Sequence, residues 1–259
     1  MSMFPRCLCV AAVWSAFLLA NPLAAQPRKA KPFTVSGTVV DTRGKPLEGV
    51  TVWLNADFVY GRASTTTGAD GRYAMGALIK ATYRAKAWIT AKYAGGTVCQ
   101  RLAMPTPTDY NSFTVSSGAV RNFRWQLTGK IGFTDSYFGA SISIWGFNGE
   151  LRDAARAVEF TLTPTGPLLD GSLGAVIVKE AALDYPSSDD GLYDLPLGTY
   201  KLKAILIGRD GSRTRLNLKA LGPAPYQSEI DLVWRTESRC GFGFDSGVQP
   251  FAVQLARAR

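Results

Sequence analysis

The ionisable side chains limit the chemistry that this chain can perform. The sequence of 259 residues contains no histidine, so Ser-His-Asp catalysis, Cys-His catalysis and histidine-ligated zinc are excluded. A catalytic route would have to use carboxylates, lysine, serine or tyrosine. Paired carboxylates for glycoside hydrolysis stay open as an alternative, because such pairs meet only in the fold. We find no motif that assigns a catalytic residue, a cofactor or a metal ligand.

One group of carboxylates has the composition of a cation site but lacks its spacing. Asp189, Asp190 and Asp194 lie close together in the sequence, and calcium favours clustered oxygen ligands. A dedicated calcium loop places carboxylates at defined alternating positions, which this segment does not. We therefore interpret it as a turn.

Aromatic side chains on the polar rows of strands are the candidate ligand contacts. Trp53 and Trp88 come first, and Tyr60, Tyr93 and Trp145 are weaker candidates of the same kind. Exposed rings beside polar groups stack on sugars or contact partner surfaces. The alternative is that a loop or a second domain covers these faces, and we favour the alternative.

The first residues are typical of a secretory signal peptide. Met1 to Arg6 carries one positive charge, Cys9 to Leu19 is a short apolar run, and Leu23-Ala24-Ala25 supplies small residues. We predict that residues 1–25 are removed. No later stretch approaches the roughly 20 apolar residues of a transmembrane helix. We expect the mature chain to be periplasmic or secreted, without a transmembrane segment.

Two cysteines survive this cleavage, and an oxidising compartment would allow them to pair. Cys99 is expected in a loop of the first half, and Cys240 follows the last predicted strand of the second half. A bridge would close a loop of about 140 residues, with an entropic benefit of about 4–5 kcal/mol in the chain-entropy model. Two separate thiols are the alternative, because the sequence does not give the sulfur separation.

The net charge gives little information about the partner. Removing Arg6 with the signal lowers the formal charge from +9 to +8. A positive charge of this size favours anionic polymers. The basic residues are scattered singly and form no long run, so we favour plain solvation and expect no binding to nucleic acid.

The elements that must position these residues are short alternating strands, and their order is repeated. Val50 to Leu54 precedes an Asp70-Gly71 turn and a strand from Thr82 to Ala87. Val158 to Leu162, Asp190-Gly191 and Tyr200 to Ala204 follow the same order. The pattern predicts an all-β fold of two tandem antiparallel Greek-key β-sandwiches rather than one large enzyme fold.

The same periodicity gives the domain boundaries. We expect a first sandwich at 33–128, a second, divergent sandwich at 140–237 and a C-terminal tail at 238–259. The closing strand Phe123 to Leu127 is matched with Ile230 to Trp234. The tail alternates at Phe251, Val253 and Leu255, which predicts an added edge strand.

Three segments of the first half carry a family resemblance. Phe33-Thr-Val-Ser-Gly-Thr-Val-Val-Asp41, Gly44-Lys-Pro-Leu-Glu-Gly-Val50 and Thr66-Thr-Gly-Ala-Asp70-Gly-Arg-Tyr73 resemble the carboxypeptidase regulatory-like domain over about residues 33–127. The resemblance implies a transthyretin-like, seven-stranded β-sandwich, often grouped with carbohydrate-binding-like folds. It also implies an accessory role without catalysis. The second half keeps Asp190-Gly-Leu-Tyr193 but lacks the opening signature.

The functional expectation is an exported, non-catalytic binding or scaffolding protein of the bacterial-type cell envelope. The expected partner is an unknown envelope protein or polysaccharide. Two alternatives belong to other classes: a hydrolase that uses carboxylates, and a structural component of an envelope assembly that docks by sheet-edge addition.

Overall fold

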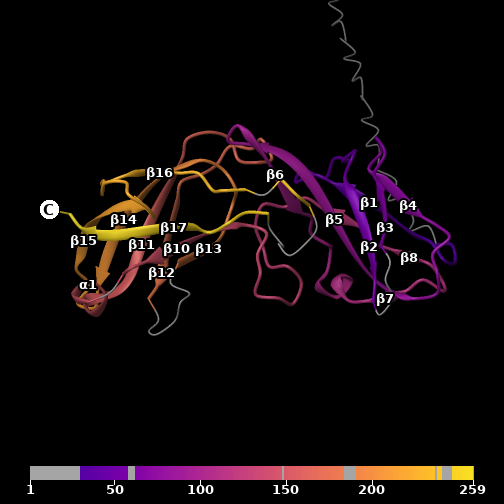
Figure 1. Cartoon of the computed structure of the whole chain (residues 1–259), viewed down its shortest axis with the longest axis horizontal. Helices are drawn as coiled ribbons and strands as arrows, with labels where there is room; N and C mark the ends of the chain where they lie inside the picture. The colour runs from indigo at the N-terminus through magenta and orange to yellow at the C-terminus, as the bar shows by residue number, and fades with distance from the viewer. Residues whose placement is uncertain are drawn as a thin grey trace, which may run out of the picture.

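The computed structural model describes residues 30–57, 62–147, 149–183, 191–236, 238–240 and 247–258, mostly as β-strands. Figure 1 shows two β-sandwiches side by side along the long axis of the molecule, the N-terminal one in indigo and magenta and the C-terminal one in orange and yellow. The predicted signal peptide lies outside the described residues. Within the described ranges, no helix has the length and apolar character needed to cross a membrane.

The N-terminal sandwich consists of two sheets. The β1 sheet holds β4 (Arg72–Met75), β1 (Val35–Val40), β8 (Ala119–Val120) and β9 (Phe123–Arg124). The β5 sheet holds β3 (Arg62–Thr66), β2 (Thr51–Ala56), β5 (Thr82–Tyr93), β6 (Gly96–Arg101) and β7 (Phe113–Thr114). A short 3-10 helix, η1, spans Pro107–Tyr110.

The predicted alternation places one row of each strand in the core of this sandwich. Val35 and Val39 of β1 pack against Val52 and Leu54 of β2, and all four are fully buried. Gly37 lies between the two valines, where a Cβ would overlap the carbonyl group of Arg121. Only glycine therefore allows the backbone to pass so closely at this position.

The C-terminal sandwich is formed by one continuous set of hydrogen-bonded strands. Its elements are β10 (Ala140–Trp145), α1 (Glu150–Ala154), β11 (Ala155–Pro164), β12 (Ile177–Ala182), β13 (Gly191–Leu195), β14 (Tyr200–Gly208), β15 (Arg213–Ala220), β16 (Ile230–Leu232) and β17 (Phe251–Arg257). The strand order is β12-β11-β14-β15-β17-β10-β13, and β16 pairs with β14. The first half of β15 pairs with β14 and its second half pairs with β17, so β15 joins the two layers.

The two sandwiches share one pairing scheme, which gives the repeat in the sequence a structural basis. β1 pairs antiparallel with β4 and parallel with β8 and β9, and β10 pairs antiparallel with β13 and parallel with β17. The order β3-β2-β5-β6 corresponds to β12-β11-β14-β15. The counterpart of the first closing strand is therefore β17. The match proposed with Ile230 to Trp234 is wrong, because β16 pairs with β14 instead.

The C-terminal segment also differs from its expected position. β17 lies between β10 and β15 in the interior of the sheet, whereas the sequence analysis predicts an edge strand in a tail. Val253 and Leu255 of β17 are buried in the core, so the alternation itself is correct. The interior position follows from parallel pairing with β10, a contact across more than 100 residues that local periodicity does not reveal.

The hairpin of β5 and β6 reaches from the N-terminal sandwich into the core of the C-terminal one (Figure 1). Ala94 and Gly95 form its two-residue turn, both with positive φ, as a tight hairpin requires. Tyr93 and Val98 behind the turn are buried among C-terminal core residues. The Tyr93 hydroxyl donates to the Gly198 carbonyl (3.0 Å) and accepts from the backbone N–H of Trp234 (3.1 Å).

Candidate functional site

The outer face of the β5 sheet holds the first sequence candidates. Trp53 of β2 and Trp88 of β5 lie on neighbouring strands with ring centroids 6.4 Å apart. Trp53 is half-buried, and the Arg62 guanidinium lies 4.2 Å from its ring centroid. A cation over an indole face is favourable, so this contact already occupies part of the ring.

Trp88 is buried, which agrees with the favoured alternative that its face is covered. It retains 3% of its surface, and its Nε1 has no hydrogen-bond partner among the described residues. Thr90, two residues further along β5, is exposed, and its Oγ1 is 3.7 Å from Cys240 Sγ. A residue distant in sequence therefore lies beside this end of the sheet, which the rows of β5 alone do not show.

The other aromatic candidates separate into distinct roles. Tyr60 lies outside the described residues. Tyr93 joins the two sandwiches and is not a surface ring. Trp145, at the end of β10, keeps 54% of its surface exposed on the outer face of the C-terminal sandwich. Among the aromatic candidates that the structure describes, Trp145 thus presents the most open ring.

Cys99 and Cys240 form a disulfide with 5.2 Å between their Cα atoms, which confirms the predicted bridge. Cys99 is on strand β6, not in a loop as expected. Thr236 Oγ1 donates to the Thr97 carbonyl (3.1 Å) beside the bridge. The segment leading to β17 is therefore attached to the N-terminal sandwich both covalently and by hydrogen bonds.

The carboxylates near the junction have structural partners. Asp194 Oδ1 accepts from the backbone N–H of Gly129 (2.7 Å), and Asp189 and Asp190 lie outside the described residues. Asp170 Oδ2 accepts from Thr42 Oγ1 (2.7 Å) of the other sandwich. Burial raises the pKa of Asp170, but hydrogen bonds from Ser172 and Thr42 outweigh it and hold the pKa below its usual value.

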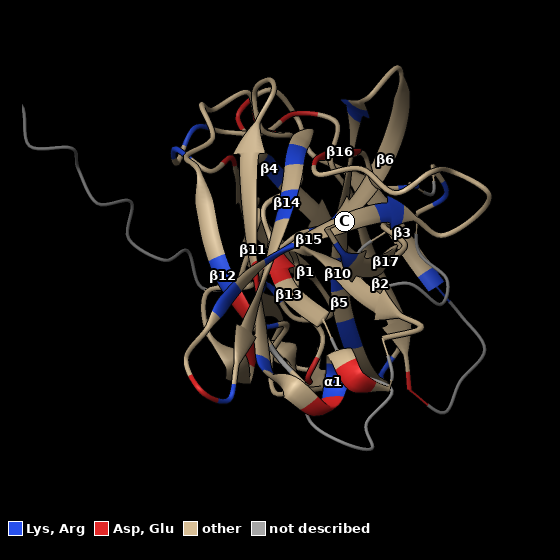
Figure 2. Ribbon diagram, turned by 90° about the vertical axis from the view of Figure 1, so that its left-hand side faces the viewer, with Lys and Arg blue, Asp and Glu red and all other residues tan. Residues whose placement is uncertain are grey.

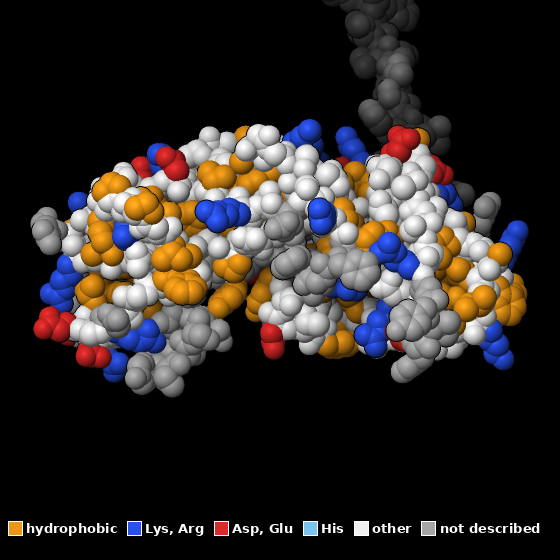
Figure 3. Space-filling model, in the orientation of Figure 1, with side chains coloured by type: hydrophobic (Ala, Val, Ile, Leu, Met, Phe, Trp, Pro, Cys, Tyr) orange, Lys and Arg blue, Asp and Glu red, His pale blue; other side chains and the backbone are white. Residues whose placement is uncertain are grey.

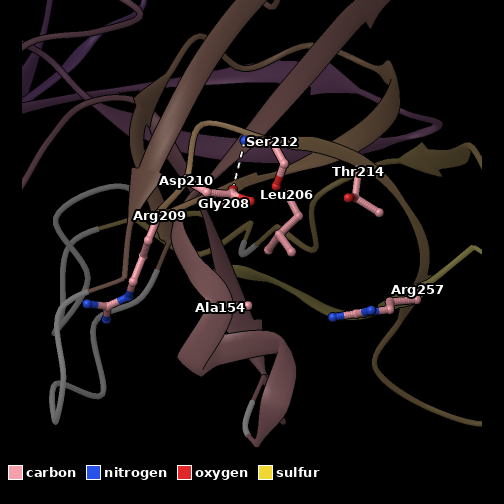
Figure 4. Close-up of a pocket in the computed structure, with 8 residues that line it drawn as sticks. All are labelled: Ala154, Leu206, Gly208, Arg209, Asp210, Ser212, Thr214 and Arg257. Carbon is pink, nitrogen blue, oxygen red and sulfur yellow. Dashed lines mark hydrogen bonds between the residues drawn. The ribbon is translucent and has the colours of Figure 1, made fainter.

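Two surface depressions contain few groups that could perform catalysis. One, of about 430 Å³, lies between α1 and the β14–β15 turn and is shown in Figure 4. Its carboxylate, Asp210, accepts from the backbone N–H of Ser212 (2.9 Å), and hydrogen bonds from Ser212 lower its pKa. The other, of about 380 Å³, lies beside Arg124 and is lined by no Asp or Glu. Neither depression brings together the two carboxylates that a hydrolase of the proposed kind needs.

Three polar side chains next to Trp145 were not found from the sequence. Gln254 of β17 pairs with Trp145, Lys219 of β15 pairs with Gln254, and Tyr226 lies beyond Lys219. The alternation of β17 contained a signal, because the residues between its buried ones must face outward. Assigning β17 to a tail separated these groups from Trp145.

Comparison with solved structures gives weak similarities. The chain is similar to the Bacillus anthracis TIE protein, with 12% identity and a TM-score of 0.31, over 88% of this chain and 34% of that one. It is similar to a streptococcal ancillary pilin (14%, 0.27), over 90% of this chain and 63% of that one. For the minor pilin of Streptococcus agalactiae the values are 12% and 0.27, with 87% and 96% covered. The chain thus spans about a third of the first protein and under two thirds of the second.

Comparison with protein families gives a specific result for the first half. No curated protein matches the sequence. Residues 34–127 match the family model of the carboxypeptidase regulatory-like domain. The match begins one residue before β1 and ends three residues after β9, so it covers the whole pairing scheme of the N-terminal sandwich. The N-terminal sandwich is a carboxypeptidase regulatory-like domain.

Proposed function

We propose that this chain is an exported, non-catalytic binding or scaffolding protein whose two sandwiches act as one rigid body. The observation that carries the proposal is the insertion of the β5–β6 hairpin into the C-terminal core. Tyr93 is hydrogen-bonded there on both sides, and the Cys99–Cys240 bridge holds the other side of the same hairpin. A junction of this kind fixes the orientation of two sheet faces, which suits a scaffold.

Three observations support this proposal. The N-terminal sandwich matches the carboxypeptidase regulatory-like domain, a resemblance that implies an accessory role. A disulfide between distant segments is typical of exported proteins, in agreement with the signal peptide predicted at residues 1–25. Neither depression described above is lined by two carboxylates. We propose a periplasmic or secreted location and a partner that is an envelope protein or a polysaccharide.

The proposal is tested by profiling the oxidised chain on arrays of glycans and purified envelope components, together with cross-linking in the native cell. We expect at least one polymer or protein to be retained and recovered. Absence of any partner in both experiments, or turnover of an array component, would sink the proposal.

A second candidate function, docking by strand addition, is favoured by the edge of the β5 sheet. Among the described strands, β3 pairs with β2 alone. The bond from Thr67 N to Val50 O (3.0 Å) sets the alternation of the ladder, so the backbone groups of Ser64 and Thr66 point away from β2. The edge strand β12 differs, because it carries a lysine. The Lys179 ammonium donates to the Tyr193 carbonyl (2.7 Å), and a lysine at a sheet edge opposes the addition of another strand.

Proline substitutions in β3 distinguish an effect on docking from an effect on folding. Ser64→Pro removes a backbone N–H that faces away from β2, so we expect the fold to persist and assembly with a partner strand to be lost. Thr65→Pro removes a bond of the ladder itself and should destabilise the domain. Assembly that survives Ser64→Pro in native-gel or light-scattering measurements would exclude β3 as the docking edge.

A further inference from the structure

A row of exposed polar and aromatic side chains crosses the outer face of the C-terminal sandwich. In register across three strands, Trp145 of β10 lies beside Gln254 of β17, which lies beside Lys219 of β15. The Lys219 ammonium is 5.1 Å from the ring centroid of Tyr226. Neighbouring strands are about 4.8 Å apart, so the row extends for more than about 10 Å. We call these four residues the β17 row.

The groups at the Trp145 end of this row are held in place by their neighbours. The Trp145 indole N–H donates to Ser143 Oγ (3.1 Å), which fixes the ring along its own strand. The Gln254 amide extends over Gly146, where a Cβ would lie 3.4 Å from the amide nitrogen. Both side chains are therefore positioned before any ligand arrives, which reduces the entropy cost of binding.

The outward residues next to the row on β10 and β17 are small. They are Ser143 of β10 and Ala252 and Ala256 of β17, which alternate with the residues that face the core. Tyr226 keeps 43% of its surface exposed at the far end of the row. Figure 3 shows hydrophobic side chains distributed over the half of the molecule that contains β10, β15 and β17.

The charge of this face is positive. The outward positions of β15 hold Arg215, Asn217 and Lys219, and none of the outward positions of β10, β15 or β17 is Asp or Glu. Figure 2 shows basic residues in blue on β15, and acidic residues in red on α1 and on several other strands and loops. The Lys219 ammonium has three donors, and one of them bonds to the Gly222 carbonyl (3.1 Å).

We propose that the β17 row binds an acidic polysaccharide. Sugar rings would stack on Trp145 and Tyr226, the Gln254 amide would bond to hydroxyl groups, and Lys219 and Arg215 would pair with carboxylate or sulfate groups. Two rings and an amide in line across neighbouring strands match an extended chain of sugars. A stable protein interface instead needs about 800 Å² on each side around an apolar centre. This inference rests on the proposed binding function and names its ligand class.

Affinity electrophoresis of the complete oxidised chain in gels containing polygalacturonate tests the inference, with neutral dextran as the second polymer. We expect retardation by polygalacturonate and little by dextran. Trp145→Ala and Tyr226→Ala should each weaken binding at least about tenfold, while circular dichroism and thermal midpoint stay unchanged because both rings are exposed.

Two matched controls separate this site from non-specific attraction. Lys219→Met should weaken binding more than Lys45→Met, which removes the same charge from an exposed position of the N-terminal sandwich. Trp53→Ala should have no effect. Equal effects of the two lysine substitutions, or binding that depends on Trp53 and not on Trp145, would overturn the inference. If the wild-type chain ignores polygalacturonate but cross-links to a protein, this inference fails and the proposed function stands.

Discussion

At the scale of single residues, Tyr93 connects the two sandwiches through two hydrogen bonds, because its hydroxyl both donates and accepts. The group accepts from Trp234 N and donates to Gly198 O inside the C-terminal core. Tyr93→Phe leaves this buried N–H and carbonyl unpaired, so we expect a loss of about 1–3 kcal/mol in the free energy of unfolding. Urea denaturation measures this value.

The matched control is Tyr226→Phe, since its ring is exposed and no hydrogen bond of its hydroxyl is involved in the junction. We expect its stability to stay within about 0.5 kcal/mol of the wild type. Equal, small losses for both substitutions would show that the hydroxyl of Tyr93 does not join the sandwiches.

Tyr93 and the buried Tyr200 of β14 predict a loss of stability in alkaline solution. Burial and the neighbouring Tyr93 raise the pKa of Tyr200 to about 12. Burial also raises the pKa of Tyr93, and the hydrogen bond from Trp234 opposes this in part. Because unfolded tyrosine titrates near pH 10, the folded state holds more protons above that pH. Stability is therefore complete below about pH 10 and falls as the pH rises toward about 12.

Urea midpoints measured between pH 8 and pH 11 test this dependence. The wild type should lose stability above pH 10, and Tyr200→Phe should show a shallower loss because one proton-binding difference has been removed. A midpoint that is constant across this range would contradict the assignment of these hydroxyls to buried surroundings.

At the scale of elements, β17 completes the C-terminal sandwich. It pairs with β10 on one side and β15 on the other, and Val253 is fully buried. Leu255→Ala should destabilise the chain by about 2–5 kcal/mol, as expected for a truncated core side chain. Deleting residues 248–259 should unfold the C-terminal sandwich, because two interior strands would then lose their partner.

Hydrogen exchange resolves these outcomes strand by strand. We expect rapid exchange in β10 and β15 of the deletion variant. The control deletes only the residues after Arg257, where the strand has ended, and should leave exchange unchanged. Retained protection of β10 in the longer deletion would mean that β17 is dispensable, as an edge strand would be.

The strands could be predicted from the sequence because each depends on local alternation. The rows of β1, β2 and β17 follow from period two, and the Asp70-Gly71 turn from the positive φ of its glycine. The neighbours of a strand were harder to predict. The interior position of β17 and the contact of Thr90 with Cys240 depend on segments more than 100 residues away.

The candidate site was only partly predictable for the same reason. Trp145 was identified as an aromatic on a polar row, and the structure shows it exposed. Gln254 and Lys219 reach it only through pairing of β17 with both β10 and β15. If β17 were an edge strand, it would have a neighbour on one side only, and the β17 row would not form. Strand order sets which side chains are neighbours across a sheet.

At the scale of the whole molecule, two independent connections join the sandwiches. The first connection is non-covalent: the tip of the β5–β6 hairpin lies in the C-terminal core. The second is covalent: the Cys99–Cys240 bridge attaches β6 to the segment that precedes β17. The loop of residues 168–170 adds a third contact, since Leu168 and Leu169 pack against both cores. The relative orientation of the two faces therefore does not depend on the disulfide alone.

Replacing both cysteines by serine tests whether the disulfide contributes to the stability of the chain, to the relative orientation of the sandwiches, or to both. The bridge spans 141 residues, so its loss should reduce stability by about 4–5 kcal/mol in the chain-entropy model. Small-angle X-ray scattering should nevertheless give an unchanged profile, because Tyr93 and Val98 stay inserted in the C-terminal core. Wild-type protein treated with reductant is the matched control. A variant with Tyr93→Ala added to the serine pair should show a larger, more variable radius of gyration. If the serine pair alone expands the molecule, the disulfide and not the hairpin sets the orientation of the sandwiches.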